Sequence, residues 1–123
     1  LSEVLLRASA FHETGLYSEA IREYSRLMGR ACPPDKYAAS LTDCLLAEYP
    51  ETAFFAQLNQ MFQDAQVKSL EKALLLFRCG EEMENRERSK IALKLYKNAF
   101  QTLIGELKKA RRAKPKPQSQ EKE

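Results

Sequence analysis

Apolar residues recur along this chain at intervals of three and four, the spacing that places them on one face of an α-helix. No segment alternates apolar and polar residues over the length of a strand, so we expect no sheet. The pattern predicts six helices. Their apolar stripes are, in chain order, Leu1, Val4, Leu5, Ala8 and Phe11; Ile21, Tyr24, Leu27 and Met28; Tyr37, Ala38, Leu41, Leu45 and Leu46; Phe54, Phe55, Leu58, Met61 and Phe62; Leu70, Ala73, Leu74, Leu76 and Phe77; and Ile91, Leu93, Leu95, Ala99, Phe100, Leu103 and Leu107.

Short connections separate these helices. Gly15 is placed to end the first helix, and Ser18 and Asp35 are suitable N-caps for the second and third. Short loops make consecutive helices antiparallel neighbours. We therefore expect an all-α domain over residues 1–107, with hairpins at about 1–32, 35–66 and 69–107. The sixth helix is long and should run into a basic segment, residues 108–123, whose Pro-rich end we expect to be disordered.

Charge is unevenly distributed along the 123 residues, whose net charge is +3. Residues 108–123 hold seven Lys or Arg against two Glu, whereas residues 1–107 hold thirteen basic and fifteen acidic side chains. The basic character therefore belongs to the C-terminal segment. The longest uncharged stretch, Thr52–Gln63, is too short and too polar for a membrane span.

The composition argues against an enzyme, because the chain has one His, no Trp and no Gly-rich loop. Three Cys form no disulfide framework and no metal-ligand spacing, and we interpret Cys32, Cys44 and Cys79 as reduced core residues. A dyad of His12 and Cys44 would need the two residues to meet across neighbouring helices, with nothing to orient them. We expect no catalytic residue, no metal and no cofactor, and a location in the cytoplasm or nucleus.

Two clusters of small and aromatic residues lie on different predicted hairpins. Gly15, Tyr17, Ala20, Ile21 and Tyr24 read G-x-Y-x-x-A-I-x-x-Y. Gly80, Ala92, Tyr96 and Ala99 repeat the pattern of small and aromatic residues on a later hairpin, with Ala92 lying 72 residues after Ala20. Both clusters resemble the tetratricopeptide repeat, a helical hairpin of about 34 residues. The resemblance implies an α-solenoid of about three such hairpins. In this family a small residue lies where the two helices of a hairpin cross.

The resemblance is imperfect, and other arrangements stay open. Leu27 replaces a usual Ala, and Cys32 stands at the usual Pro. Phe54 and Phe55 occupy the middle hairpin where a small residue would be expected. A helical bundle or another α-solenoid remains an alternative.

The resemblance also implies a function, the binding of a partner peptide or helix by a groove that the first helices of the hairpins line. Carried over by position, the groove candidates are Leu5, Ser9, His12, Lys36, Ala39, Ser40, Asp43, Phe77, Arg78, Glu81 and Asn85. Some family members clamp the terminal carboxylate of chaperone tails. At the five clamp positions this chain has Leu5, Ser9, Ser40, Leu74 and Arg78, of which only Arg78 matches, so we expect no such clamp.

Two other functions stay open, and both involve the ends of the domain. A cluster of cations could hold the phosphates of RNA without sequence preference, as part of a ribonucleoprotein; its members are Lys108, Lys109, Arg111, Arg112, Lys114 and Lys116. Self-association is the other, because Leu1, Val4, Leu5 and Leu6 form an apolar end without a cap. At the opposite end, we expect Phe100, Leu103, Ile104 and Leu107 to fold back over the third hairpin. We expect the chain to be the C-terminal part of a larger protein.

Overall fold

The protein is helical throughout the computed structural model, which describes residues 2–30 and 32–113. These residues contain no strand, so the prediction of an all-α chain is confirmed. The described residues form six α-helices and two short 3-10 turns: α1 Ser2–Glu13, α2 Tyr17–Ser25, η1 Pro34–Lys36, α3 Ala38–Glu48, η2 Glu51–Ala53, α4 Phe54–Ala65, α5 Ser69–Asn85 and α6 Ser89–Ala113. No helix among the described residues is both long and apolar enough to cross a bilayer.

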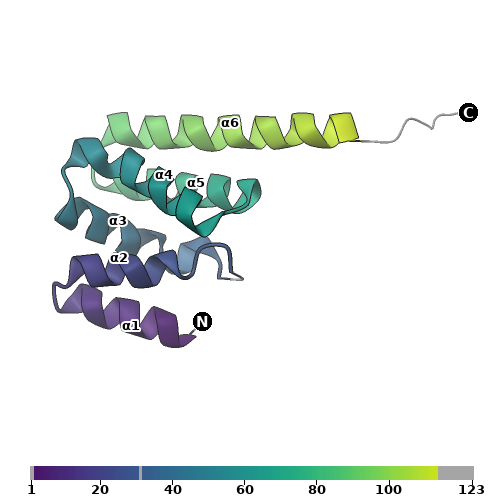
Figure 1. Cartoon of the computed structure of the whole chain (residues 1–123). Coiled ribbons are helices and arrows are strands. Elements are labelled where there is room, and N and C mark those ends of the chain that lie inside the picture. The colour runs from purple at the N-terminus through teal and green to yellow at the C-terminus, as the bar shows by residue number, and fades with distance from the viewer. Residues whose placement is uncertain (1, 31, 114–123) are drawn as a thin grey trace, which may run out of the picture.

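Consecutive helices run in opposite directions, and α1, α2, α3, α5 and α6 follow one another through the stack, with α4 in front of α5 in this view (Figure 1). Helix α3 lies inside the stack, where it contacts α1, α2, α4 and α5. Helix α6 lies along α5 and then projects beyond it (Figure 1). Because α1, α3 and α5 alternate with the other helices, these three run in the same direction.

The helix ends match the sequence signals only in part. Gly15 ends α1 with a φ of +80°, and the amide of Leu16 donates to the Phe11 carbonyl at 2.8 Å, as in a Schellman motif. The N-cap predictions were wrong. Ser18 lies inside α2, whose N-cap is Leu16, and Asp35 lies in the η1 turn before α3 begins. Pro33 and Pro34 fix this turn, because their carbonyls accept hydrogen bonds from Lys36 and Tyr37.

The core joins side chains from all six helices. Tyr24 of α2 and Tyr37 are stacked, with ring centroids 6.0 Å apart and an angle of 12° between the rings. Helix α4 is buried through the bulky side chains of Phe54, Leu58 and Phe62. Bulky contacts keep helix axes apart, which explains why the α4 backbone approaches α3 over only a short length.

Two expectations for the third hairpin were wrong. In α5, Ala73 and Leu76 are buried as predicted, but Leu70, Leu74 and Phe77 are exposed, and Leu75, Cys79 and Met83 are buried in the core instead. In α6, Phe100, Leu103 and Leu107 are exposed and Ile104 is half-buried, so they do not fold back as a cap. Only Ala92, Leu95 and Ala99 of α6 are buried.

Helices α5 and α6 approach closely at Gly80. A Cβ atom on Gly80 would lie 2.7 Å from Cε1 and 2.8 Å from Cδ1 of Tyr96. Real Cβ atoms do not come so close, so only glycine permits the ring to lie this close to this turn of α5. The Tyr96 ring is held there, because its centroid is 5.4 Å from that of Phe77 and its hydroxyl donates to Glu84 Oε1 at 2.6 Å.

Replacing Gly80 should therefore separate two helices that now touch. We expect Gly80→Ala to lower the free energy of unfolding by about 1–3 kcal/mol, as overpacking does. Gly105 lies in α6, and an added Cβ there would have no neighbouring atom within 4 Å. As the matched control, Gly105→Ala should raise stability by about 0.5–1 kcal/mol through helix propensity. Urea unfolding measures both, and a stabilising Gly80→Ala would contradict the close approach.

Candidate partner-binding face

The eleven groove candidates lie on the surfaces of α1, of α3 with its preceding turn, and of α5. None of them is buried. Five are fully exposed, namely Ser9, Lys36, Ala39, Phe77 and Asn85, and the other six are half-buried. Helix α1 contacts α3, and α3 contacts α5, so the face is continuous.

Polar contacts join the C-terminal ends of α1 and α5 to the middle of α3. His12 Nε2 of α1 lies 2.6 Å from Asp43 Oδ2 of α3. The other carboxylate oxygen of Asp43 lies 3.6 Å from Nη2 of Arg86, which follows α5 and also donates to Glu82 Oε1 at 3.1 Å. Asp43 therefore bridges the first and third hairpins. Two of the predicted binding residues, His12 and Asp43, therefore contact each other.

A shallow hollow of about 450 Å³ lies between the N-terminal halves of α1 and α3. Leu5, Ser9, Lys36 and Ser40, all predicted groove residues, contribute to its lining. Its floor includes Tyr24, which is buried. The hollow mixes apolar and hydroxyl groups and carries a single cation, so it has no strong chemical preference.

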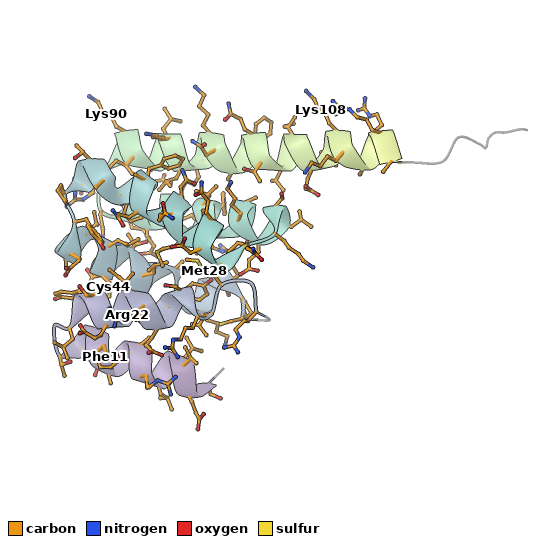
Figure 2. All side chains as sticks on the ribbon, viewed as in Figure 1. Phe11, Arg22, Met28, Cys44, Lys90 and Lys108 are labelled. Atoms are coloured by element: carbon orange, nitrogen blue, oxygen red, sulfur yellow. The ribbon has the colours of Figure 1, made fainter. Side chains whose placement is uncertain are left out.

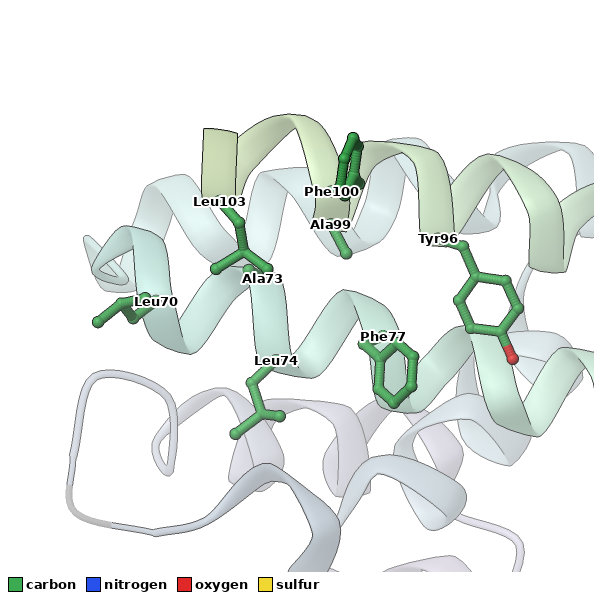
Figure 3. A pocket seen from close by; sticks show the side chains of 8 residues that line it. All are labelled: Leu70, Ala73, Leu74, Phe77, Tyr96, Ala99, Phe100 and Leu103. Atoms are coloured by element: carbon green, nitrogen blue, oxygen red, sulfur yellow. The ribbon is translucent and has the colours of Figure 1, made fainter. Parts of the chain in front are cut away.

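A larger groove, of about 750 Å³, lies between α5 and α6. Leu70, Leu74 and Phe77 reach it from α5, and Tyr96, Phe100 and Leu103 reach it from α6 (Figure 3). Ala73 and Ala99 complete the lining at the helix crossing. We call this surface the α5–α6 groove. Its one side-chain oxygen, the Tyr96 hydroxyl, is already hydrogen-bonded to Glu84.

Of the residues that line the α5–α6 groove, only Phe77 was predicted from the sequence to belong to the binding face. Arg78 and Glu81 lie beside it and are paired with each other, with Arg78 Nη1 2.8 Å from Glu81 Oε1. The other lining residues were expected to be core residues. A signal for them did exist, because the apolar residues of α5 and α6 cover an arc wider than one neighbouring helix can bury.

The basic cluster lies on the last two turns of α6. Lys108, Lys109, Arg111 and Arg112 are all exposed, and none of them forms an ion pair with another described residue. Along this helix, Lys90 and Lys108 point away from the stack (Figure 2). Lys114 and Lys116, like Leu1 at the other end, lie outside the described residues.

The histidine is paired with a carboxylate and the three cysteines are buried. His12 contacts Asp43 and does not meet Cys44, which is fully buried. Burial raises the pKa of all three thiols, that of Cys44 to about 11 and that of Cys79 to about 12. A protonated, buried thiol is a poor nucleophile. Within residues 2–30 and 32–113, no three His, Cys, Asp or Glu side chains gather as metal ligands would.

Comparison with known proteins adds no further constraint. No family model, no curated protein and no solved structure matches this chain. The resemblance to the tetratricopeptide repeat therefore rests on residues of the chain itself.

The raised pKa of Cys79 makes stability fall at high pH. The unfolded thiol releases its proton near pH 8.5, whereas the folded one keeps it until about pH 12. Between these values the unfolded state binds fewer protons, so the free energy of unfolding should fall as pH rises. The free energy of unfolding, measured by urea titration, should fall between pH 8 and pH 10 for both chains. The fall should be about 1–2 kcal/mol smaller for Cys79→Ala than for the unmodified chain. Equal losses would contradict the buried, protonated thiol.

Proposed function

We propose that this chain is a noncatalytic binding domain, built from three tetratricopeptide-like hairpins, which holds a partner protein on the face of α1, α3 and α5. The alternating helix directions, the Gly80–Tyr96 contact and the shared direction of α1, α3 and α5 favour the repeat arrangement. The middle hairpin departs from it, because bulky residues replace the small one at its crossing.

Exposed apolar surface is the observation that favours binding most. Nine large apolar side chains are exposed in the described part of the chain, and five of them line the α5–α6 groove: Leu70, Leu74, Phe77, Phe100 and Leu103. A sixth, Leu107, lies one turn beyond Leu103 on the same side of α6. Single exposed apolar residues are ordinary, but a contiguous group marks an interaction site. The buried thiols and the occupied His12 favour a binding role over a catalytic one.

The proposal includes no clamp for chaperone tails. Four of the five relevant positions are Leu5, Ser9, Ser40 and Leu74, which carry no cation to pair with a ligand carboxylate. The fifth, Arg78, already pairs with Glu81. We also infer a reducing compartment, the cytoplasm or the nucleus, because three unpaired thiols suit it.

Association with RNA is a second candidate, favoured by the four exposed cations at the end of α6. They could neutralise phosphates, and the cluster contains no aromatic ring on which a base could stack. Such binding would be nonspecific and would weaken steeply with salt. Self-association is a third candidate, favoured by the exposure of Leu6 on α1.

Affinity capture with the full chain separates these candidates. Partners should survive ribonuclease and deletion of residues 108–123, and should be lost when Leu74→Glu places a charge on the exposed apolar surface. Loss with ribonuclease would move the function to RNA. A molar mass of twice the monomer that returns to one with Leu6→Glu would move it to self-association. If Leu74→Glu leaves the capture of partners intact, the exposed apolar surface around Leu74 on α5 is not the binding surface.

A further inference from the structure

The α5–α6 groove carries opposite charge at its two ends. Helices α5 and α6 are antiparallel and touch at Gly80 and Tyr96, so Leu107 lies near the start of α5. At that end Arg111, eleven residues after Phe100, lies on the groove side of α6, with Lys108 beside it, and the positive N-terminus of α5 is close by. The far end has Glu81, which Arg78 partly neutralises, and Glu84, which accepts from Tyr96.

The groove is also isolated from the rest of the stack. On α5, Lys72 lies on another face, with its Nζ 5.8 Å from the Phe62 ring centroid of α4. On α6, Lys94 similarly places its Nζ 4.6 Å from the Phe55 ring centroid. Helix α4 therefore covers one side of the α5–α6 pair, and the groove lies on faces of α5 and α6 turned away from α4.

Two occupants are disfavoured by composition and charge. Residues 114–123 read KPKPQSQEKE and contain no large apolar side chain that would fill the groove. A second copy of α6 would bring together two strongly cationic helices, because seven of the eight charged residues in α6 are Lys or Arg. Like charges at this density repel each other unless salt screens them.

We propose that the α5–α6 groove binds an amphipathic α-helix of a partner protein, with the acidic end of that helix against Lys108 and Arg111. This inference rests on the proposed function and names the partner's chemistry. The apolar wall of α6 runs from Tyr96 to Leu107, which is about 16 Å or three turns. A helix with apolar residues at i, i+4, i+7 and i+11 matches that length. Its carboxylates would gain ion pairs that the basic end does not make with described residues.

The probe is a labelled synthetic peptide of 17 residues, as long as α5, with Leu at i, i+4, i+7 and i+11 and Glu in its terminal two turns. A second peptide has Lys in place of each Glu. Fluorescence anisotropy with the full chain should give a Kd roughly tenfold or more lower for the acidic peptide than for the basic one. Equal affinity for the two peptides, or no binding of the acidic one, would overturn the proposal.

Variants on the protein side locate the binding. Phe100→Glu should raise the Kd of the acidic peptide roughly tenfold or more. The control is Leu93→Glu on the same helix, because Leu93 is 67% exposed and Phe100 64%, yet Leu93 lies outside the groove lining. Circular dichroism checks that both variants keep their helices. An effect of Leu93→Glu as large as that of Phe100→Glu would place the peptide elsewhere and overturn the proposal.

A charge reversal tests the basic end. Lys108→Glu together with Arg111→Glu should remove or invert the preference for the acidic peptide. Lys90→Glu together with Lys97→Glu changes net charge equally on the N-terminal half of α6 and should preserve it. An unchanged preference after the first pair would overturn the assignment of the acidic end, as would a dimer of the full chain that Phe100→Glu dissociates.

The outcome separates this inference from the function beneath it. If captured partners depend on Leu74 but the acidic peptide does not bind, partner binding stands and the acidic helix is rejected. If the peptide binds as expected and no cellular partner is captured, the groove chemistry stands and the proposed function falls.

Discussion

The contact between Gly80 and Tyr96 sets the geometry on which the candidate site depends. Because Gly80 has no side chain, the aromatic ring lies against the α5 backbone, and the two longest helices are drawn together. The ring is favoured in this position because its hydroxyl donates to Glu84 and Phe77 lies beside it. Close helices bury only narrow faces of each other. The apolar residues to one side, including Leu74 and Phe100, therefore stay in water and form the groove.

The three hairpins use bulk differently, and this decides how they pack. The third hairpin has small residues at its crossing and a close backbone approach. The second has Phe54, Leu58 and Phe62 on its second helix, so α4 is buried by large side chains while its backbone stays distant from α3. Helix α3 compensates as the hub of the stack, and Asp43 on its surface links the first hairpin to the third through His12 and Arg86.

The sequence predicted helix positions better than it predicted burial. Periodicity and Gly15 located helices because these signals are local to the chain. The N-caps at Ser18 and Asp35 failed because Leu16 and the Pro33–Pro34 turn set the helix starts through backbone bonds. In α5 two adjacent faces are apolar, and only the three-dimensional position of α3 and α6 decides that Leu75 and Met83 are buried while Leu70 and Leu74 are exposed. The groove was missed for this reason.

The projecting end of α6 has a consequence for its own helix–coil equilibrium. From Leu107 to Ala113 every residue is exposed. Helix α5 begins at Ser69, near Leu107, so it does not extend alongside these last turns. Helices without tertiary support are marginal in water when they are this short, even though cations near a C-terminus suit the helix dipole. Backbone hydrogen bonds at this end should open and exchange with solvent faster than those near Leu95. A molecule that binds these turns more tightly as a helix than as a coil would also lengthen the time that they spend as a helix.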